Sequence, residues 1–241
     1  MKLAVVGYGK MGREVEAVAR ERAHEPVVVR RGSAFPASVP VGIDFTRADA
    51  VLANTRAAMK AKARYVIGTT GWDAQRDELA RVVAAAEGGV VHAANFSLGV
   101  NLFYKVVREA AALFARFPDY DPYVLERHHR QKKDAPSGTA RALARILEEA
   151  GGPRPHAATA LEGPLADDRF HVAALRAGGI VGEHTVGFDS GGDEILLEHR
   201  ARTRRGFALG AVLAAEWVAD RTGLYGFEDV VDDLARRRPA T

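Results

Sequence analysis

The sequence predicts an α/β protein of two domains, an N-terminal doubly wound parallel sheet and a C-terminal mixed α+β domain. Over the first part of the chain, short apolar runs alternate with amphipathic helical segments, which is typical of βαβ units. A glycine-rich turn follows the first of these runs. Between residues 170 and 201 the alternation gives way to three β-like runs separated by Gly-rich turns. We expect the first domain to comprise residues 1–97 and 207–241, and the second to comprise 98–206.

The first domain contains five apolar runs with the length of buried parallel strands. Met11, Val15 and Val18 recur at helical spacing after the first run. Gly32 and the prolines that follow it leave no room for a regular helix between the second and third runs. The expected strands are 2–6, 27–30, 41–45, 65–68 and 90–93, and the expected helices are 10–22, 47–62 and 73–87.

The second domain has a different pattern. Its runs HVAALR, IVGEHTVGF and EILLEHRA, separated by Gly-rich turns, suggest an antiparallel meander. A final apolar helix over 206–220 is expected to return to the first domain. The other expected elements are a helix over 98–116, a strand over 122–129 and a helix from Ser137 to about Ala150.

Composition excludes several classes of protein. The 241-residue chain is 47% hydrophobic and 27% charged, as in ordinary globular proteins. Its net charge is +3 with both signs interspersed, so it has no basic block suited to nucleic acid. The absence of cysteine excludes thiolate nucleophiles and thiolate metal sites. No apolar run approaches the ~18–20 residues of a membrane span, and the N-terminal run is too short for a signal peptide. We expect a soluble, cytoplasmic protein that binds neither nucleic acid nor membrane.

A G-x-G-x-x-G motif follows the first strand and opens the first helix; its residues are Gly7, Tyr8, Gly9, Lys10, Met11 and Gly12. In this position the motif is typical of a Rossmann dinucleotide site. Gly7 permits a tight turn, Gly9 lets a pyrophosphate approach the backbone, and Gly12 lets helix and strand pack closely. The first N–H groups of the helix would hold the phosphates. The alternative is an ordinary strand-to-helix turn.

The end of the second strand carries no acidic residue. An Asp or Glu there usually binds the ribose hydroxyls of NADH. This chain has Arg30 and Arg31 instead, where a 2′-phosphate would lie. We therefore predict that NADPH is used at least as well as NADH, although the two arginines could also be simple solvated charges.

Two further turns follow later strands, at the edge where a doubly wound sheet holds its cofactor. Each is unremarkable alone, and their shared position suggests cofactor contacts. The residues of the first turn are Gly68, Thr69 and Thr70, and those of the second are Ala93, Ala94, Asn95 and Phe96.

The stretch ERHHRQKKDAPSGTA, residues 126–140, concentrates chemically active side chains. Strand alternation would place Glu126 and His128 on one face and send His129 to the other. Adjacent histidines rarely chelate one ion, and no H-x-x-x-H or H-E-x-x-H spacing follows, so no metal site is expected.

A helix start follows these histidines at Ser137, which either Ser137 or Asp134 could cap. If uncapped, the first turn would offer N–H groups and the hydroxyl of Ser137 or Thr139 to an anion, with Lys132 or Lys133 adding positive charge. A nearby histidine could then deliver a proton to an anionic substrate that accepts hydride from a nicotinamide. The alternative is a basic surface loop before a capped helix.

These residues resemble the dihydrodipicolinate reductase family of lysine and diaminopimelate biosynthesis. The signature comprises Glu126, His128, His129, Lys132, Asp134, Pro136, Ser137, Gly138, Thr139 and Ala140. Further matching segments are GYGKMGREV, IDFT at 43–46, GTTGW at 68–72, AANFSLGVNL at 93–102 and RAGGIVGEHTVGF at 176–188. The family often has Glu-Arg at the end of its second strand, where this chain has Val29-Arg30.

The resemblance implies a Rossmann domain that binds NADPH or NADH and a second domain for substrate and for assembly, usually as a homotetramer. It implies reduction of a small cyclic dicarboxylate, 4-hydroxy-tetrahydrodipicolinate or dihydrodipicolinate, to tetrahydrodipicolinate. His128 would donate the proton with Lys132 as its catalytic partner. His129 would contact the substrate, and Gly138 and Thr139 would hold a substrate carboxylate.

Some alternatives stay open from the sequence. Within RAGGIVGEHTVGF, Glu183 and His184 could form an acid–base pair, but the glycines favour a structural or interdomain element. The chain could also be a Rossmann reductase for another amino-acid-derived anion, or a dinucleotide sensor without catalysis.

Overall fold

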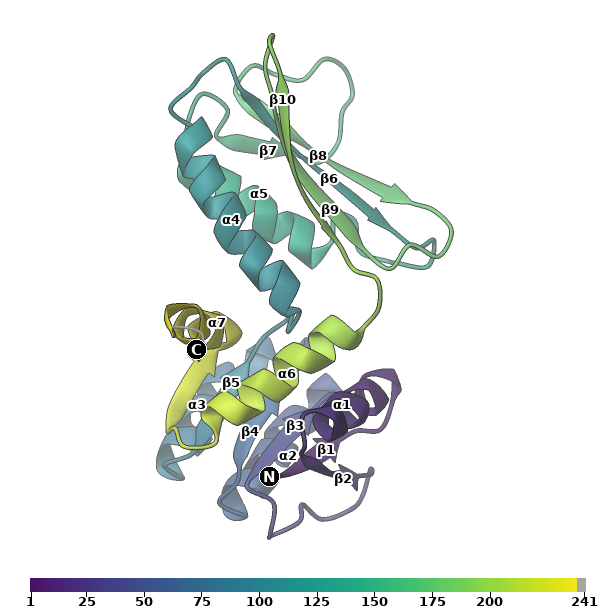
Figure 1. Cartoon of the computed structure of the whole chain (residues 1–241), viewed down its shortest axis with the longest axis vertical. Helices are drawn as coiled ribbons and strands as arrows, with labels where there is room; N and C mark the ends of the chain where they lie inside the picture. The colour runs from purple at the N-terminus through teal and green to yellow at the C-terminus, as the bar shows by residue number, and fades with distance from the viewer. Residues whose placement is uncertain (238–241) are drawn as a thin grey trace. The chain divides into compact units, whose positions relative to one another are not determined.

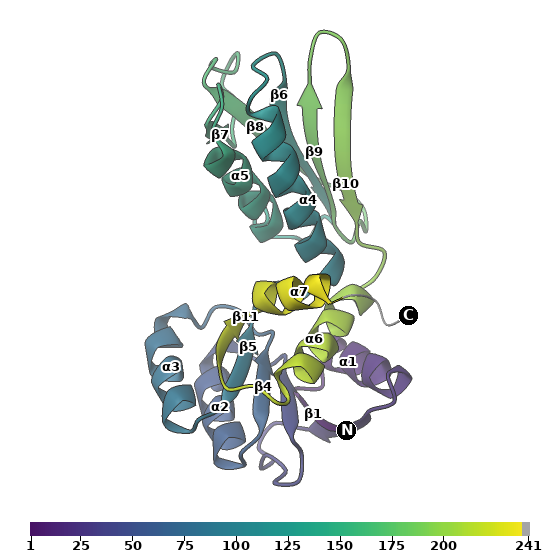
Figure 2. The ribbon, with the colours of Figure 1, turned by 60° about the vertical axis from the view of Figure 1, so that its left-hand side comes forward.

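The structure, a computed structural model, describes residues 1–237 and divides them into two compact units. The first unit comprises 1–98 and 204–237, and the second comprises 99–203. Figures 1 and 2 show the sheet and helices of each unit. The domain boundaries expected from the sequence differ from the observed ones by one residue near 98 and by three residues near 204. Residues 238–241 of the expected first domain lie outside the described part of the chain. Among the described helices, none has the length and apolar character needed to cross a membrane.

The first unit is built on a six-stranded parallel sheet with the order β11-β5-β4-β3-β1-β2. Its strands are β1 (Lys2–Val6), β2 (Glu25–Val29), β3 (Val41–Asp44), β4 (Arg64–Ile67), β5 (Gly89–His92) and β11 (Gly223–Gly226). Strand β2 lies on one side of β1, and β3 and the later strands lie on the other side, so the sheet is doubly wound. This confirms the predicted fold class of the first domain.

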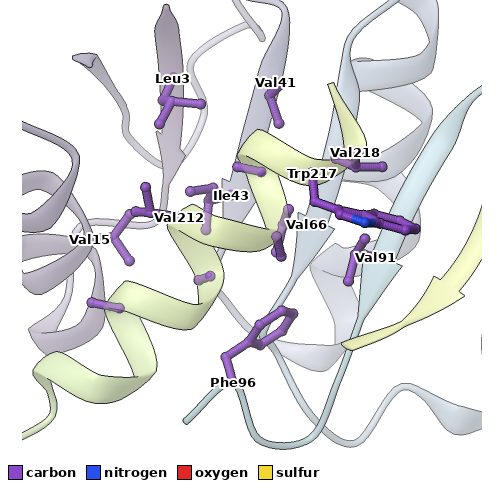
Figure 3. Close-up of a cluster of buried hydrophobic side chains, with 14 of the residues drawn as sticks. Leu3, Val15, Val41, Ile43, Val66, Val91, Phe96, Val212, Trp217 and Val218 are labelled. Carbon is purple, nitrogen blue, oxygen red and sulfur yellow. The ribbon is translucent and has the colours of Figure 1, made fainter. Parts of the chain in front are cut away.

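Helices cover both faces of this sheet because the strands are buried on both sides. Leu3 and Val5 point into one core and Ala4 and Val6 into the other. The helices on the first face are α1 (Lys10–Glu21), α6 (Arg205–Val218) and α7 (Phe227–Arg236), and those on the second are α2 (Val51–Lys60) and α3 (Arg76–Ala85). In Figure 3, Val212 and Trp217 of α6 lie against the strands of the sheet. The final helix therefore does return to the first unit.

Two predicted helices end earlier than the sequence suggests. The expected helices 47–62 and 73–87 each begin with a short 3-10 turn, η1 (Ala48–Ala50) and η2 (Asp73–Gln75). Lys62 and Glu87 then take positive φ angles of 57° and 47°, which end a right-handed helix.

Strand β11 and helix α7 lie outside the predicted set. Two of the four residues of β11 are glycines, so it lacks the apolar run that identifies a strand.

The second unit packs two helices on a five-stranded mixed sheet with the order β10-β9-β6-β8-β7. Its strands are β6 (Asp121–His128), β7 (His156–Ala158), β8 (Arg169–Arg176), β9 (Glu183–Asp189) and β10 (Glu194–Arg200), and its helices are α4 (Leu98–Phe114) and α5 (Gly138–Ala150). Strands β9 and β10 form an antiparallel hairpin, but β8 pairs in parallel with β6. The predicted meander is therefore wrong for β8, since β6 lies between β8 and β9 in the sheet.

One face of this mixed sheet is covered and the other is open. Helices α4 and α5 pack together on Val124, Val172 and Val186 (Figure 2). The opposite face carries Leu175 and Leu196, which are 44% and 53% exposed. The predicted alternation along β6 is confirmed, because Val124, Glu126 and His128 are buried while the intervening residues are half-buried.

Candidate active site

The glycine-rich turn after β1 has the backbone that its sequence requires. Gly7 has φ +88°, a conformation that favours glycine. A Cβ atom at Gly12 would lie 2.1 Å from the carbonyl oxygen of Gly7, so helix α1 can approach β1 only with glycine there. Gly9 caps α1 without a side-chain hydrogen bond, and apart from its chain neighbours no described residue has an atom within 4 Å of where its Cβ would be. The turn therefore leaves the start of α1 open to a ligand.

The turns after β1, β3 and β4 line one open pocket. Strands β1 and β3 are neighbours at the point where the winding reverses, which is where such sheets bind nucleotides. The lining residues are Gly9, Lys10, Met11, Phe45, Thr46, Arg47, Ala48, Gly68, Thr69 and Thr70. The structure thus brings together the glycine motif and the Gly68–Thr70 turn. The residues from Phe45 to Ala48 were missed as site candidates, and their signal was the strand-end motif IDFT.

The third expected cofactor segment lies beside this pocket without lining it. Ala93 donates its backbone N–H to the carbonyl of Ile67 at 3.2 Å, which keeps the end of β5 next to the end of β4. The rings of Phe45 and Phe96 meet edge to face with centroids 6.4 Å apart. Asn95 accepts a hydrogen bond from the N–H of Ser97 at 2.8 Å.

The two arginines after β2 are exposed, and Arg30 lies next to the glycine motif. Its guanidinium carbon is 5.4 Å from the ring centroid of Tyr8, a cation–π distance. The Tyr8 hydroxyl donates a hydrogen bond to Glu16 on α1, and that bond raises the pKa of Tyr8. The hydrogen bond from Arg47 lowers the pKa of Asp49, and the exposed Arg31 adds a smaller effect in the same direction. Positive charge therefore gathers at this end of the nucleotide pocket.

A fully buried carboxylate, Asp44, organises the pocket wall. Its side chain accepts hydrogen bonds from the backbone N–H and hydroxyl of Thr46 at 2.8 and 2.6 Å and from the hydroxyl of Thr69 at 3.1 Å. It also accepts from Asn54 and Tyr65, both at 2.9 Å. Burial and the charge of Asp44 raise the pKa of Tyr65 well above its usual value. One strand-end carboxylate thus ties together the turns that follow β3 and β4.

In the second unit, Glu126 lies at the centre of a buried polar cluster and is 0% exposed. Its Oε1 accepts hydrogen bonds from Arg176 at 2.7 Å and from the backbone N–H of Ser137 at 2.9 Å. Its Oε2 lies 3.2 Å from Nδ1 of His128 and 3.7 Å from Nε2 of His184. Two hydrogen-bond donors and two imidazoles therefore surround one carboxylate.

These contacts set the charge states of the cluster. Burial acts to raise the pKa of Glu126, but its contacts with His128, His184, Ser137 and Arg176, in that order, outweigh burial and hold the pKa well below its usual value. Burial lowers the pKa of His184, and the contact with Glu126 opposes that shift without cancelling it. At neutral pH, Glu126 is therefore charged and His184 favours the neutral imidazole.

The loop after β6 places the other predicted residues. Strand β6 ends at His128, and His129 follows as a half-buried residue whose carbonyl accepts from the N–H of Lys132 at 3.1 Å. The Lys132 ammonium lies 2.7 Å from a carboxylate oxygen of Asp134, and this bond lowers the pKa of Asp134. Lys133 is exposed.

The start of α5 is capped by Ser137, one of the two caps that the sequence allows, so the alternative of an uncapped turn does not hold. The Ser137 hydroxyl accepts from the N–H of Ala140 at 3.1 Å and lies 3.2 Å from Nε2 of His184. Ser137 is 2% exposed, so its hydroxyl faces the interior. Gly138 is exposed and begins the helix, where a backbone N–H has no partner within the helix. Thr139 follows it in the first turn.

Three residues of this cluster are not among the predicted site residues, although the sequence allows His184 as half of an acid–base pair. His184 is buried 5.0 Å, ring to ring, from His128. A Cβ atom at Gly182 would lie 3.0 Å from Nε2 of His128. Arg176 contacts Glu126, as above. All three fall within RAGGIVGEHTVGF, so that motif belongs to the site. Glu183 is not paired with His184, because it points the other way and forms an ion pair with Arg127 at 2.7 Å.

Three residues of the cluster carry side-chain atoms of the kind that bind metal ions. Ligand-type atoms of Glu126, His128 and His184 all lie within 4.8 Å of one another. The expectation of no metal rested on the adjacent pair of His128 and His129, and His129 is not a member of this group. Arg176 contacts the same carboxylate and opposes a second cation there. The absence of a metal stays a prediction.

Two family models match the chain. The model described as dihydrodipicolinate reductase, N-terminus, matches residues 26–96, and the one described as dihydrodipicolinate reductase, C-terminus, matches residues 99–231. The chain belongs to the dihydrodipicolinate reductase family. The resemblance recognised in the sequence is therefore confirmed across both units.

Two 4-hydroxy-tetrahydrodipicolinate reductases and one solved dihydrodipicolinate reductase structure are similar to the chain over nearly its whole length. The 4-hydroxy-tetrahydrodipicolinate reductase of Christiangramia forsetii is 34% identical over 243 residues, covering 97% of this chain and 99% of that protein. That of Methanoculleus marisnigri is 39% identical over 254 residues, covering 96% and 99%. The structure of dipicolinate-bound dihydrodipicolinate reductase from Paenisporosarcina sp. TG-14 matches with a TM-score of 0.76 and 27% identity, covering 95% of this chain and 98% of that one.

Asp44→Asn is expected to loosen the cofactor pocket. The amide nitrogen cannot accept a hydrogen bond, so buried donors lose their partner at a cost of about 1–3 kcal/mol in the free energy of unfolding. Cofactor affinity should fall as well, because Thr46 and Thr69 lose their common anchor. Urea denaturation and fluorescence titration with NADPH measure the two effects.

The matched control for this variant is Asp49→Asn. Asp49 is an exposed carboxylate paired with Arg47, and its replacement should leave the unfolding free energy nearly unchanged. Equal stability of Asp44→Asn and Asp49→Asn would refute the anchoring role.

Proposed function

We propose that this chain catalyses the NAD(P)H-dependent reduction of 4-hydroxy-tetrahydrodipicolinate to tetrahydrodipicolinate, a step of diaminopimelate and lysine biosynthesis. The 4-hydroxyl group leaves as water to give a conjugated double bond, and that bond then takes up one hydride and one proton. The observation that carries the proposal is the buried contact between Glu126 and His128 beside the start of α5. It places an ionisable imidazole and a helix N-terminus in one polar cluster, which suits a proton donor next to a bound anion. Membership of the dihydrodipicolinate reductase family supplies the substrate class.

The first unit has the features needed to hold a nicotinamide dinucleotide. The open start of α1 at Gly9 fits the pyrophosphate, and the positive charge of Arg30 and Arg31 fits the adenosine end. The turns Gly68–Thr70 and Ala93–Phe96 would complete the cofactor contacts. When bound, the reduced nicotinamide supplies a hydride.

The second unit supplies the groups that act on the substrate. Gly138 and Thr139 at the start of α5 would hold one carboxylate of the cyclic substrate, where the helix dipole and backbone N–H groups favour negative charge. Lys132 would stabilise the negative charge that develops when an electron-poor double bond accepts the hydride. His128 would protonate the adjacent carbon, and His129 would contact the substrate. A direct contact of Ser137 with the substrate stays a prediction, since its hydroxyl caps α5.

Replacing His128 with glutamine is expected to lower turnover by about 10²–10⁴-fold, the usual contribution of a general acid. Cofactor binding should be intact, because the first unit is unchanged. The measurement is NADPH oxidation in a coupled assay, with the product of the synthase that joins pyruvate and aspartate semialdehyde as substrate.

His156→Gln is the control, since His156 is an exposed histidine of the same unit. Near-normal turnover of His128→Gln would remove His128 from the mechanism. NADPH binding by the unaltered protein without any oxidation would overturn the proposed reaction and favour a dinucleotide sensor.

Use of NADPH at least as well as NADH is a further part of the proposal. Arg30→Ala should raise the KM for NADPH by about 10-fold or more, because a charge-assisted hydrogen bond to the 2′-phosphate is lost, and leave the KM for NADH nearly unchanged. Arg56→Ala is the control, an exposed arginine paired with Glu78. A strong preference of the unaltered protein for NADH would contradict this assignment.

We also propose a cytoplasmic homotetramer that assembles through the open face of the mixed sheet. Leu175 and Leu196 lie on that face together with Tyr123 and Leu125 of the strand between them, so it carries apolar side chains across several strands. Light scattering should give four times the 25.9 kDa mass of one chain. Leu196→Arg should give a smaller species, whereas Leu161→Arg, at an exposed leucine outside the sheet, should not. A monomeric unaltered protein would exclude this assembly.

A further inference from the structure

We propose that Glu126 is a positioning residue that orients the imidazole of His128 and fixes the helix start at Ser137 through the two oxygens of one carboxylate. The inference rests on the proposed role of His128 as proton donor. It adds a residue that touches neither substrate nor cofactor and acts through its neighbours.

The two oxygens of Glu126 have separate tasks. Oε1 faces the scaffold, where it accepts from Arg176 at 2.7 Å and from the N–H of Ser137 at 2.9 Å. Oε2 faces the histidines, 3.2 Å from Nδ1 of His128 and 3.7 Å from Nε2 of His184. Among the described residues, neither Oε2 nor Nδ1 of His128 has a well-aligned hydrogen bond, so each is the other's nearest ionic partner. A buried carboxylate in this position favours a proton on the facing nitrogen.

This contact determines which nitrogen of His128 can deliver a proton. With Nδ1 turned to Glu126, Nε2 lies on the opposite edge of the ring and faces Gly182, where a Cβ atom would approach to 3.0 Å. Glycine at 182 therefore leaves room beside Nε2. The carboxylate holds the proton on Nδ1 and leaves Nε2 to exchange its own proton, as in other carboxylate–histidine pairs.

The same carboxylate fixes the segment that precedes α5. Ser137 is held at its N–H by Glu126, and Arg176 also donates to the carbonyl of Asp134 at 2.6 Å. Residues 134–137 are therefore anchored at both ends to the Glu126–Arg176 ion pair. The charged or titratable groups around the pair of His128 and His184 are Glu126 from β6, Arg176 from β8 and Lys132 from the following loop. Only Glu126 among them presents a negative charge to the ring.

The first test needs no substitution. Nitrogen-15 NMR of the unaltered protein, with His128 assigned by comparison with His128→Gln, reports which ring nitrogen carries the proton in the neutral form. We expect the Nδ1–H form. A neutral His128 protonated at Nε2 would overturn the inference even if no variant folds.

The second test is kinetic. Glu126→Gln keeps the shape of the side chain and removes its charge, so kcat should fall on the order of 10²-fold while the Kd for NADPH is unchanged. Glu126→Asp keeps the charge and should retain more of kcat than Glu126→Gln. The control is Glu149→Gln, at an exposed carboxylate paired with Arg108 in the same unit, and its kcat should equal that of the unaltered protein.

A double variant separates positioning from general structural support. Glutamine at 126 keeps one oxygen that can still accept from the N–H of Ser137, so the helix start stays fixed in Glu126→Gln. If the lost charge acts through His128, then Glu126→Gln should cost little further kcat in the His128→Gln background, because the oriented group is already gone. Independent, multiplicative losses would show a structural role only and overturn the inference. If His128→Gln is inactive while Glu126→Gln is near normal, the proposed reaction stands and the positioning role fails. If the unaltered protein has no turnover, the proposed reaction itself fails, and the NMR result still decides the orientation of His128.

Discussion

A carboxylate that loses its water must find hydrogen-bond donors inside the protein, and both units are organised around that constraint. Asp44 ends β3 and draws donors from the turns that line the nucleotide pocket. Glu126 lies near the end of β6, accepts hydrogen bonds from Arg176 of β8 and from the start of α5, and lies against His184 of β9. In each unit a buried carboxylate fixes the conformation of the nearby loops. The ligand-facing groups of those loops are therefore held in place before a ligand binds.

The central place of β6 explains why its carboxylate can gather so many partners. Strand β8 lies on one side of β6 in parallel and β9 lies on the other side in antiparallel. The register sets His184 directly opposite Glu126 and Arg176 opposite His128. A simple meander of β8, β9 and β10 would have separated these groups. The mixed order of the sheet is therefore what assembles the cluster.

The sequence could predict features that depend on local backbone geometry. The turn at Gly7, the close approach at Gly12 and the shared face of Glu126 and His128 follow from residue spacing alone. The partners of Glu126 could not be predicted in this way, because Arg176 and His184 join it only through strand order, which is set by tertiary packing. Ser137 was ambiguous for the same reason: whether its hydroxyl faces a ligand or the interior depends on what packs against α5.

The return of the chain through α6, β11 and α7 has a consequence for biosynthesis. Ribosomes make the strands β1 to β5 first, yet the face covered by α6 stays bare until residues 205–218 have emerged. The second unit, residues 99–203, is continuous and is complete before that point. The second unit can therefore complete its fold before the first unit, whose last segments are made after it. An N-terminal fragment would expose the apolar residues that α6 normally covers, which is the kind of surface that chaperones bind during synthesis.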